Sequence, residues 1–596
     1  MLSSATEPKG DLMAAPYLVL VLLALTSQAT DPSAGSNSPS ESQPGDPRPS
    51  DQRPNDQRPN DQRPNILFAF ADDWGRHAGI YGELEPGGVN DVVRTPHFDQ
   101  LAADGVLFTN AFVSAPSCTP CRSSILSGRH FWQTGRGAIL LGAVWDGSLP
   151  SYPLMLEEAG YHIGHTYKTW APGTPQVHPY GGDRTRYQQD GGRFNAFSRL
   201  VMKAKGKNAD ATAAARQAVI DDLLAEARGN FARCLDDAAA DDEPFCYWFG
   251  PTNVHRKWAE GFGQEVWDID PDDLTGKLPA FLPDTAVVRE DLASYFGEVA
   301  AFDAGLGVLL EELDARGLAE NTIVVVSGDH GAPGFPNGKC NVYDFGAAVP
   351  LAVRWPARVP AGRVVTDFVS LPDLAPTFLE AAGEGEQIAE AGMSARSLLP
   401  VLTSDEDGRV DESRGAVYIG RERHVSSAQP EFKPYPTRAV RTDGWLYVRN
   451  FRPERFPMGT GPQFGGNDEL DTTVSELKND TFVAFADLDA SPTKAELVTL
   501  RSLVAMRPYY DIAFGARPAE ELYDLTSDPD QMNNLAADPQ YAATRQRLET
   551  QLMTKLRETG DPRLVDDGAF FETGEMAGEI YPGERKTPPP GWKKRN

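Results

Sequence analysis

The segment Cys118-Thr119-Pro120-Cys121-Arg122 combines reactive side chains with the pattern of a helix start. Two cysteines separated by two residues at a helix N-terminus are typical of thiol–disulfide exchange, because the helix end favours a thiolate. The same segment also fits an ordinary helix start, with Pro120 in the first turn and the cysteines acting as small hydrophobic side chains. These five residues alone favour the ordinary helix start, and the rest of the chain changes that order.

Titratable residues follow three apolar runs that are predicted to be buried strands. The runs and the residues that follow them are Asn65–Ala71 with Asp72 and Asp73, Phe245–Phe249 with His255, and Thr322–Gly328 with Asp329 and His330. In an open α/β sheet, ligands bind beyond the carboxyl ends of the strands. We therefore expect these side chains to share one active site.

The aspartates in this set predict a metal site. Two adjacent aspartates repel each other unless a divalent cation keeps both ionised, although such a pair can also simply cap a loop. Asp72, Asp73 and Asp329 offer the hard oxygen ligands that Ca²⁺ and Mg²⁺ prefer. The imidazole of His330 suits zinc, manganese or iron better than calcium.

The elements that must position these residues alternate between helical and strand patterns. Thr95-Pro96 predicts the start of a helix that stops at Gly105. Further helices are expected near 154–159 and 289–316, and further strands at 106–113 and 161–168. This alternation predicts an α/β fold with a large, mostly parallel sheet flanked by helices on both faces. After about residue 400 the pattern changes to a smaller α+β region, with antiparallel strands within 418–450 and a helix near 541–559.

The chain divides into five predicted segments. Residues 1–29 contain a short apolar run, AAPYLVLVLLAL, followed by a small-x-small site, which indicates a signal peptide. Residues 30–64 are a low-complexity linker that ends in three copies of Asp-Gln-Arg-Pro-Asn. We expect a catalytic domain at 65–405, a C-terminal subdomain at 406–560 and a surface tail at 561–596, and a periplasmic or extracellular location.

The overall charge excludes several classes of partner. A net charge of -29 and a pI near 4.7 argue against binding to nucleic acid or to an anionic membrane surface. No segment after the leader is apolar enough to predict a stable membrane span. Five cysteines in so long an exported chain do not form a disulfide framework. An anionic substrate requires a local cationic pocket.

A third interpretation of the cysteine segment takes Cys118, Pro120 and Arg122 as C-x-P-x-R, which resembles the sulfatase signature. The motifs NILFAFADDWG, TPHFDQLAADGVLFTNAF, CTPCRSSILSGRH, YKTW, VVVSGDHG and ELYDLTSDP follow in family order. From about residue 65 to 535 the chain resembles a type I sulfatase of the alkaline-phosphatase superfamily. The stretches FLPDTAVVREDLASYFGEVAAFDAGLGVLLEELDARG and YPTRAVRT resemble the heparan N-sulfatase branch.

The resemblance implies a role for each matching residue. Cys118 would be oxidised to formylglycine by a formylglycine-generating enzyme, and the aldehyde hydrate would attack sulfur, form a sulfated enzyme and release sulfate as the aldehyde re-forms. One divalent cation, Ca²⁺ or alternatively Mg²⁺, would be held by Asp72, Asp73, Asp329 and His330 together with residue 118, formed from Cys118. Arg122, Lys168 and Lys339 would hold the sulfate oxygens, and His255 would act as general acid.

The resemblance also implies a substrate and includes departures from the family pattern. We expect hydrolysis of O-sulfate or N-sulfate groups of a sulfated saccharide, with contacts to the sugar from Arg256, Arg289, Glu422 and His424. Trp170 stands where many sulfatases have histidine, Cys121 where serine or alanine is common, and His330 where asparagine is frequent.

Three other functions remain open from the sequence. One is a phosphodiesterase or phosphonate hydrolase of the same superfamily, since phosphate and sulfate are similar in shape. Another is a thiol–disulfide oxidoreductase, which would use Cys118 and Cys121 but leave the aspartates unexplained. The last is a non-catalytic protein that binds sulfated polysaccharide without converting Cys118.

Overall fold

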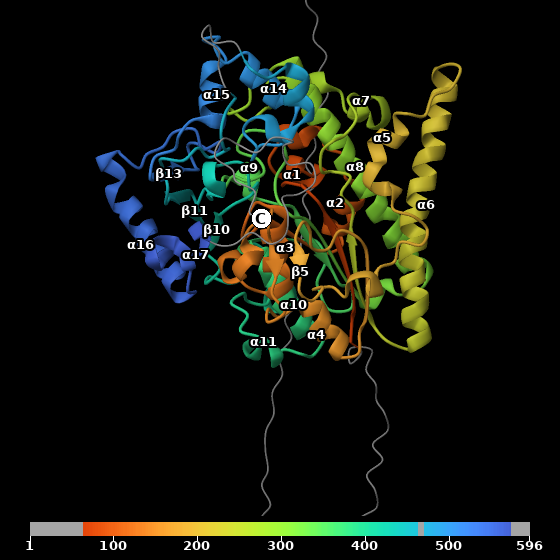
Figure 1. Cartoon of the computed structure of the whole chain (residues 1–596). Helices are drawn as coiled ribbons and strands as arrows, with labels where there is room; N and C mark the ends of the chain where they lie inside the picture. Colours follow the sequence, from red (N-terminus) through yellow and green to blue (C-terminus); the bar gives the residue numbers. More distant parts are fainter. Residues whose placement is uncertain (1–62, 463–469, 574–596) are drawn as a thin grey trace, which may run out of the picture. The chain divides into compact units, whose positions relative to one another are not determined.

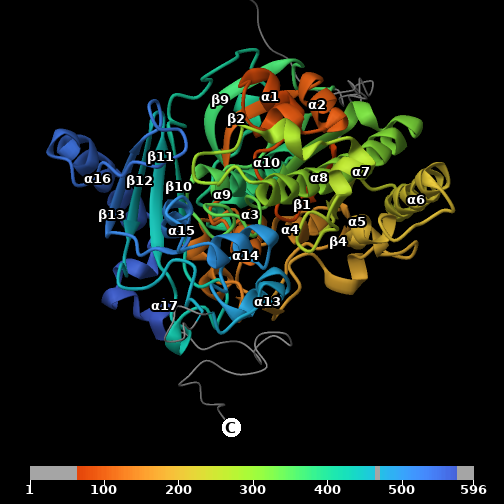
Figure 2. The ribbon, with the colours of Figure 1, turned by 90° about the horizontal axis from the view of Figure 1, so that it is seen from above.

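The central strand of the protein is buried on both of its faces. The computed structural model describes residues 63–462 and 470–573 and places strand β1 at Asn65–Ala71, as predicted. Alternate side chains of β1 enter two different hydrophobic cores: Ile66, Phe68 and Phe70 in one, and Leu67, Ala69 and Ala71 in the other. A strand between two cores needs a continuous apolar sequence. The sheet therefore lies between two layers of helices (Figures 1 and 2).

The central sheet has seven strands in the order β4-β6-β1-β7-β8-β2-β9. Besides β1, these are β2 (Val106–Phe112), β4 (His162–Tyr167), β6 (Phe245–Gly250), β7 (Thr322–Gly328), β8 (Leu351–Arg354) and β9 (Arg363–Ser370). β8 runs antiparallel to both of its neighbours, and the other pairings are parallel. The predicted mostly parallel sheet is confirmed, and β4, β6, β1 and β7 end at the same edge.

Helices cover both faces of this sheet. One core contains side chains of α3 (Cys118–Ser127), α4 (Tyr152–Glu158) and α10 (Leu374–Ala381). The opposite core contains side chains of α1 (Gly79–Leu84), α2 (Pro96–Ala103), α5 (Phe197–Val201), α6 (Ala209–Asp241), α7 (Phe262–Trp267) and α8 (Ala286–Ala315). The helices predicted to start at Thr95-Pro96 and to lie near 154–159 and 289–316 are confirmed by α2, α4 and α8.

Helix α8 is the one described helix that is long and apolar enough to cross a membrane by length and composition. Its most apolar window is 89% buried inside the fold, which is the position of a core helix. The short helices elsewhere are α9 (Asp344–Ala347), α11 (Gln387–Glu390), α12 (Leu399–Leu402), α13 (Val474–Asn479), α14 (Pro492–Thr499), α15 (Arg507–Phe514) and α17 (Ala569–Thr573).

A second, antiparallel sheet confirms the predicted C-terminal α+β region. Its strands, in order, are β10 (Ala416–Arg421), β11 (Thr437–Thr442), β12 (Trp445–Asn450) and β13 (Glu520–Asp524). Helix α16 (Ala542–Glu558) packs on this sheet through Leu548, Leu552 and Leu556, which recur on one helix face (Figure 2). The predicted domain boundary at residue 405 falls between α12 and β10.

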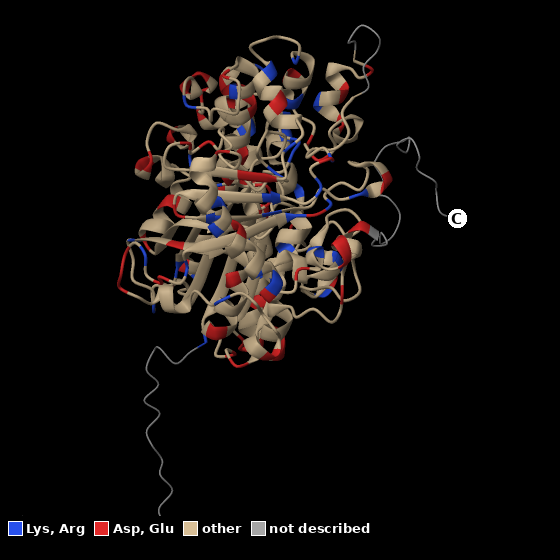
Figure 3. Ribbon diagram, turned by 90° about the vertical axis from the view of Figure 1, so that its left-hand side faces the viewer, with Lys and Arg blue, Asp and Glu red and all other residues tan. Residues whose placement is uncertain are grey.

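Both ends of the chain extend beyond the described residues. The predicted signal peptide, the linker up to residue 62 and residues 574–596 of the predicted tail lie outside the described residues. In the described start of that tail, Asp561 and Arg563 are buried, while Val565 and Phe570 are exposed. Charged residues are spread over the helices and loops around the sheet (Figure 3).

Candidate active site

The strand ends bring the predicted catalytic residues together. Asp72 and Asp73 follow β1, Asp329 and His330 follow β7, Lys168 follows β4, and His255 lies in the loop after β6. Helix α3 begins at Cys118 and adds Arg122, while Lys339 comes from the loop between β7 and α9. We refer to these nine residues as the active-site cluster. Their contacts, described below, form one connected network.

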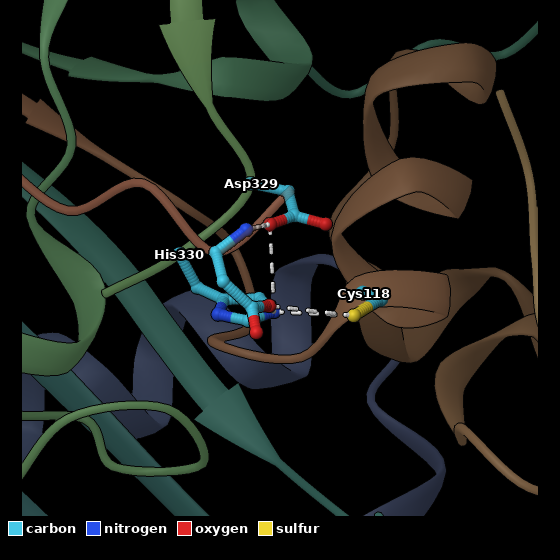
Figure 4. Close-up of side chains that lie close together, drawn as sticks. Cys118, Asp329 and His330 are labelled. Atoms are coloured by element: carbon cyan, nitrogen blue, oxygen red, sulfur yellow. Dashed lines mark hydrogen bonds and ion pairs between the residues drawn. The ribbon is translucent and has the colours of Figure 1, made fainter. Parts of the chain in front are cut away.

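Four members of the cluster form a group that can hold a metal ion. One ligand atom each from Asp73, Cys118, Asp329 and His330 lies within 4.8 Å of the others, and all four residues are buried. His330 Nε2 is 3.2 Å from Asp73 Oδ1 and 3.3 Å from Cys118 Sγ. Figure 4 shows Cys118 pointing from the first turn of α3 toward His330, with Asp329 beside them. Two buried carboxylates facing each other fit a divalent cation.

The turn after β1 holds Asp73 in place. Asp73 has a left-handed backbone with φ of 67°, a conformation that aspartate tolerates better than most residues. Its N–H donates to Asp329 Oδ1 at 2.7 Å. Tyr295 of α8 donates its hydroxyl hydrogen to the Asp73 carbonyl at 3.0 Å and accepts from Gly75 N–H at 3.0 Å. The core helix therefore fixes the direction of the Asp73 carboxylate.

Arg122 links helix α3, which carries Cys118, to two acidic strand ends. Its Nε lies 3.0 Å from Asp329 Oδ2, its Nη2 lies 3.0 Å from Asp72 Oδ1, and the guanidinium is fully buried. Its Nη1 donates to the Lys168 carbonyl at 3.0 Å. A rigid planar fork suits this bridging better than a single ammonium. Arg122 thus orients the acidic residues as well as carrying positive charge into the cluster.

Two lysines supply the remaining fixed positive charge. Lys168 Nζ lies 2.6 and 2.9 Å from the two carboxylate oxygens of Asp72. Asp72, a predicted metal ligand, is therefore paired with both Lys168 and Arg122 in the structure. Burial opposes ionisation of Asp72, but the charges of Lys168 and Arg122 outweigh it and hold its pKa well below the usual range. Lys339 Nζ lies 3.0 Å from Asp73 Oδ2 and 3.1 Å from His255 Nε2. His255 is thereby placed beside the metal-binding group.

The cysteines are not suited to disulfide exchange. Burial, and next the negative charge of Asp72, raise the pKa of the Cys118 thiol well above its usual range. Burial and Asp329 do the same for Cys121, and all five cysteines are free and buried. Exchange requires an accessible thiolate. The structure therefore disfavours the oxidoreductase interpretation.

The four predicted sugar-contact residues separate into two pairs. Arg256 follows His255 and forms a bidentate ion pair with Asp291 at 2.8 and 2.9 Å, and His424 Nδ1 lies 2.8 Å from Ser117 Oγ, next to Cys118. Both border the active-site cluster. Arg289 instead pairs with Asp272 and Asp284 near the start of α8, and Glu422 is buried between Arg438 and Arg563. Among the described residues, no hydrogen bond or ion pair connects these last two to the cluster.

Two further residues clarify the site. Trp170, a departure from the family pattern, is buried beside α3, where its Nε1 donates to Ser123 Oγ at 2.8 Å. Asp489, which the sequence analysis missed, lies with Oδ2 3.4 Å from Lys339 Nζ. It follows no strand pattern and comes from a distant part of the chain, so no local signal identifies it.

Comparison with known proteins places this geometry in a family. The family model described as Sulfatase matches residues 64–384, which include every member of the active-site cluster. The chain belongs to the sulfatase family. It is a sulfuric ester hydrolase, as the resemblance of its motifs implied. The sulfatase is 29% identical over 541 residues to human N-sulphoglucosamine sulphohydrolase, covering 85% of this chain and 92% of that protein. It is 24% identical over 549 residues to an ulvan-active sulfatase of Formosa agariphila, covering 88% and 78%.

Solved structures support the fold of the sulfatase. An enzyme bound to its substrate D-glucosamine-2-N,6-O-disulfate superposes with a TM-score of 0.51 at 17% identity, covering 84% of this chain and 99% of that chain. A phosphonate monoester hydrolase of Agrobacterium radiobacter gives a TM-score of 0.51 at 19% identity, covering 84% and 97%. At this level of identity the similarity concerns the fold alone.

Proposed function

We propose that this sulfatase is exported, to the periplasm or the extracellular space, and hydrolyses O-sulfate or N-sulfate groups of a sulfated saccharide. The observation that carries the proposal is the convergence of Asp73, Cys118, Asp329 and His330 within 4.8 Å, beside three cationic side chains. An acidic protein needs such a local concentration of positive charge to hold an anionic substrate. The relatives with sulfatase names support the same reaction class.

The position of each charged side chain indicates its role in the proposed reaction. Lys168 and Lys339 contact the carboxylates of Asp72 and Asp73, where they can bind sulfate oxygens by charge-assisted hydrogen bonds. Arg122 holds Asp72 and Asp329 in place behind them. His255 Nε2 faces Lys339 and Asp73, and its side chain is 33% exposed, so it can deliver a proton to the leaving oxygen or nitrogen as the bond to sulfur breaks.

Residue 118 and a cation complete the proposed site. We propose that Cys118 is converted to formylglycine by a formylglycine-generating enzyme, which would supply a hydrate oxygen as nucleophile and a second hydroxyl that lets the aldehyde re-form. Asp73, Asp329 and His330, with Asp72 next to them, would hold one divalent cation, Ca²⁺ in preference to Mg²⁺. A bound cation would neutralise these carboxylates and polarise the sulfate group.

Parallel turnover assays test the proposal. Protein co-produced with a formylglycine-generating enzyme is assayed with 4-nitrophenyl sulfate, 4-nitrophenyl phosphate, glucosamine N-sulfate and glucosamine 6-sulfate. We expect sulfate esters or N-sulfates to be hydrolysed in preference to phosphate, and Cys118→Ala to abolish the reaction. Preference for the phosphate would instead support a phosphoesterase, and cation binding without turnover of any of them would support a non-catalytic binding protein.

A further inference from the structure

We infer that Asp489 is a specificity-determining residue, whose carboxylate accepts a hydrogen bond from an N–H or O–H group of the saccharide that carries the sulfate. The inference rests on the proposed function, because it assumes a saccharide sulfate bound beside Cys118. It adds a contact to the part of the substrate that is not transferred.

Asp489 offers an acceptor oxygen that has an ion-pair partner but no hydrogen bond within the described residues. Its Oδ2 is buried and makes no hydrogen bond within the described residues, and the nearest cation, Lys339 Nζ, is 3.4 Å away. Lys339 is closer to Asp73 Oδ2, at 3.0 Å, and to His255 Nε2, at 3.1 Å. A buried oxygen without a hydrogen bond is unfavourable, even when a cation lies nearby. A donor on a bound ligand would remove that cost.

Asp489 belongs to the more exposed side chains around the active-site cluster. The side chains of His255, Asp489 and Lys168 are 33%, 16% and 13% exposed. Those of Asp73, Asp329, His330 and Lys339 are exposed by 3% or less. Asp489 is therefore more accessible to a ligand than these buried members of the cluster, and it lies beside Lys339.

The segment that carries Asp489 is rigidly attached to the catalytic part of the fold. Lys494 of α14 is buried and donates to the Leu488 carbonyl at 2.8 Å, next to Asp489. Ser491 donates to the Gly334 carbonyl at 2.7 Å, and Thr493 Oγ1 donates to Asp291 at 2.7 Å. Asp291 is also the partner of Arg256, which follows His255. Asp489 is thus held in a fixed position relative to the active-site cluster.

The charge of Asp489 limits what it can recognise. Burial opposes its ionisation, but the positive charge of Lys339 outweighs burial and lowers the pKa of Asp489. An ionised carboxylate only accepts hydrogen bonds and repels sulfate oxygens. It must therefore face the uncharged or cationic part of the substrate, where a saccharide carries hydroxyl and N–H groups. A simple aryl sulfate offers no such donor.

A comparison of two substrates tests this inference. The Asp489→Asn variant is compared with the wild type on 4-nitrophenyl sulfate and on the better saccharide of glucosamine N-sulfate and glucosamine 6-sulfate. We expect kcat/KM for the saccharide to fall at least ten times more than kcat/KM for the aryl sulfate, with most of the difference in KM. Asp480→Asn is the matched control, because Asp480 is exposed in the same segment and should not change this ratio.

Two results would overturn the inference in different ways. An equal fall for both substrates in a stably folded Asp489→Asn protein would show that Asp489 acts only by positioning Lys339. Thermal unfolding of both variants establishes that they are folded. A wild-type enzyme that hydrolyses neither sulfate would contradict the proposed function itself, and the inference with it.

Discussion

Arg122 Nε lies 3.0 Å from Asp329 Oδ2, and neither side chain is exposed to solvent. This ion pair joins the first turns of α3, which carry Cys118, to the end of β7, which carries two predicted metal ligands. Arg122 also reaches Asp72 at the end of β1. The helix that carries Cys118 and two of the predicted metal ligands are therefore held by one side chain.

Replacing Arg122 by lysine should damage both stability and catalysis. A lysine keeps the charge but cannot contact Asp72 and Asp329 together, and disrupting a buried pair costs about 3–5 kcal/mol. We expect a lower unfolding midpoint and a fall in kcat/KM for 4-nitrophenyl sulfate of about 100-fold. Arg129→Lys, at the end of the same helix, is the control and should change neither quantity strongly. A wild-type unfolding midpoint for Arg122→Lys would refute the bridging role.

Removal of divalent cations should destabilise the folded protein. Without a cation, the negative charges of Asp73 and Asp329 are buried next to each other, and the neighbouring positive side chains offset their repulsion only in part. We expect a chelator to lower the melting temperature, and Ca²⁺ to restore it more effectively than Mg²⁺. A ligand at 100 times its Kd stabilises a protein by about 2.7 kcal/mol.

The matched variant for the cation experiment is Asp329→Asn, which removes one carboxylate from the group. Its melting temperature should respond little to Ca²⁺. If the wild type and this variant responded equally, the cation would bind elsewhere in the protein.

Glu298 should make stability depend on pH. Its carboxylate accepts from Asn253 Nδ2 at 3.1 Å, in the loop that leads to His255, and burial raises its pKa to about 7. The folded state then holds this proton more tightly than the unfolded state, so stability should fall as pH rises from about 4.5 to 7, by about 1–3 kcal/mol. Urea unfolding midpoints at pH 5, 6 and 7 measure the slope. Glu298→Gln keeps the acceptor without the proton and should show a smaller slope; identical slopes would exclude this group as the cause.

Cys121 should be dispensable for the reaction. Its side chain is buried in the core beside the sheet, and both cysteines of the pair are free. We expect Cys121→Ala to retain most sulfatase activity and to lose about 1 kcal/mol of stability. Reduced and oxidised samples of the wild type should also differ little. Complete loss of activity in Cys121→Ala would reopen the thiol–disulfide interpretation.

Much of the site could be predicted because it depends on parallel strands. Apolar runs such as Asn65–Ala71 and Thr322–Gly328 form β1 and β7, which are direct neighbours, so Asp73 and Asp329 meet at one edge. Parallel pairing makes the strand ends coincide whatever the length of chain between them. The strand pattern therefore indicated the strand-end residues of the cluster, while Cys118, Arg122, Lys168 and Lys339 came from the resemblance to the sulfatases.

The missed features depend on contacts that leave no local pattern. The antiparallel strand β8 has only 4 residues, too few to show its direction. Asp489 reaches Lys339 because Lys494, Ser491 and Thr493 attach their segment to distant parts of the fold. Glu422 resembled a sugar contact in sequence, yet Arg438 and Arg563 enclose it. Such pairings appear only when the whole chain is folded.

Mass spectrometry of the peptide that contains Cys118 tests the central claim most directly. The protein is produced with and without a formylglycine-generating enzyme, digested and analysed for the chemical state of residue 118, while sulfatase activity is measured on the same samples. The account predicts that an aldehyde or its hydrate replaces the thiol and that activity rises with the converted fraction. An unmodified Cys118 thiol in fully active protein, or a Cys118–Cys121 disulfide, would contradict it.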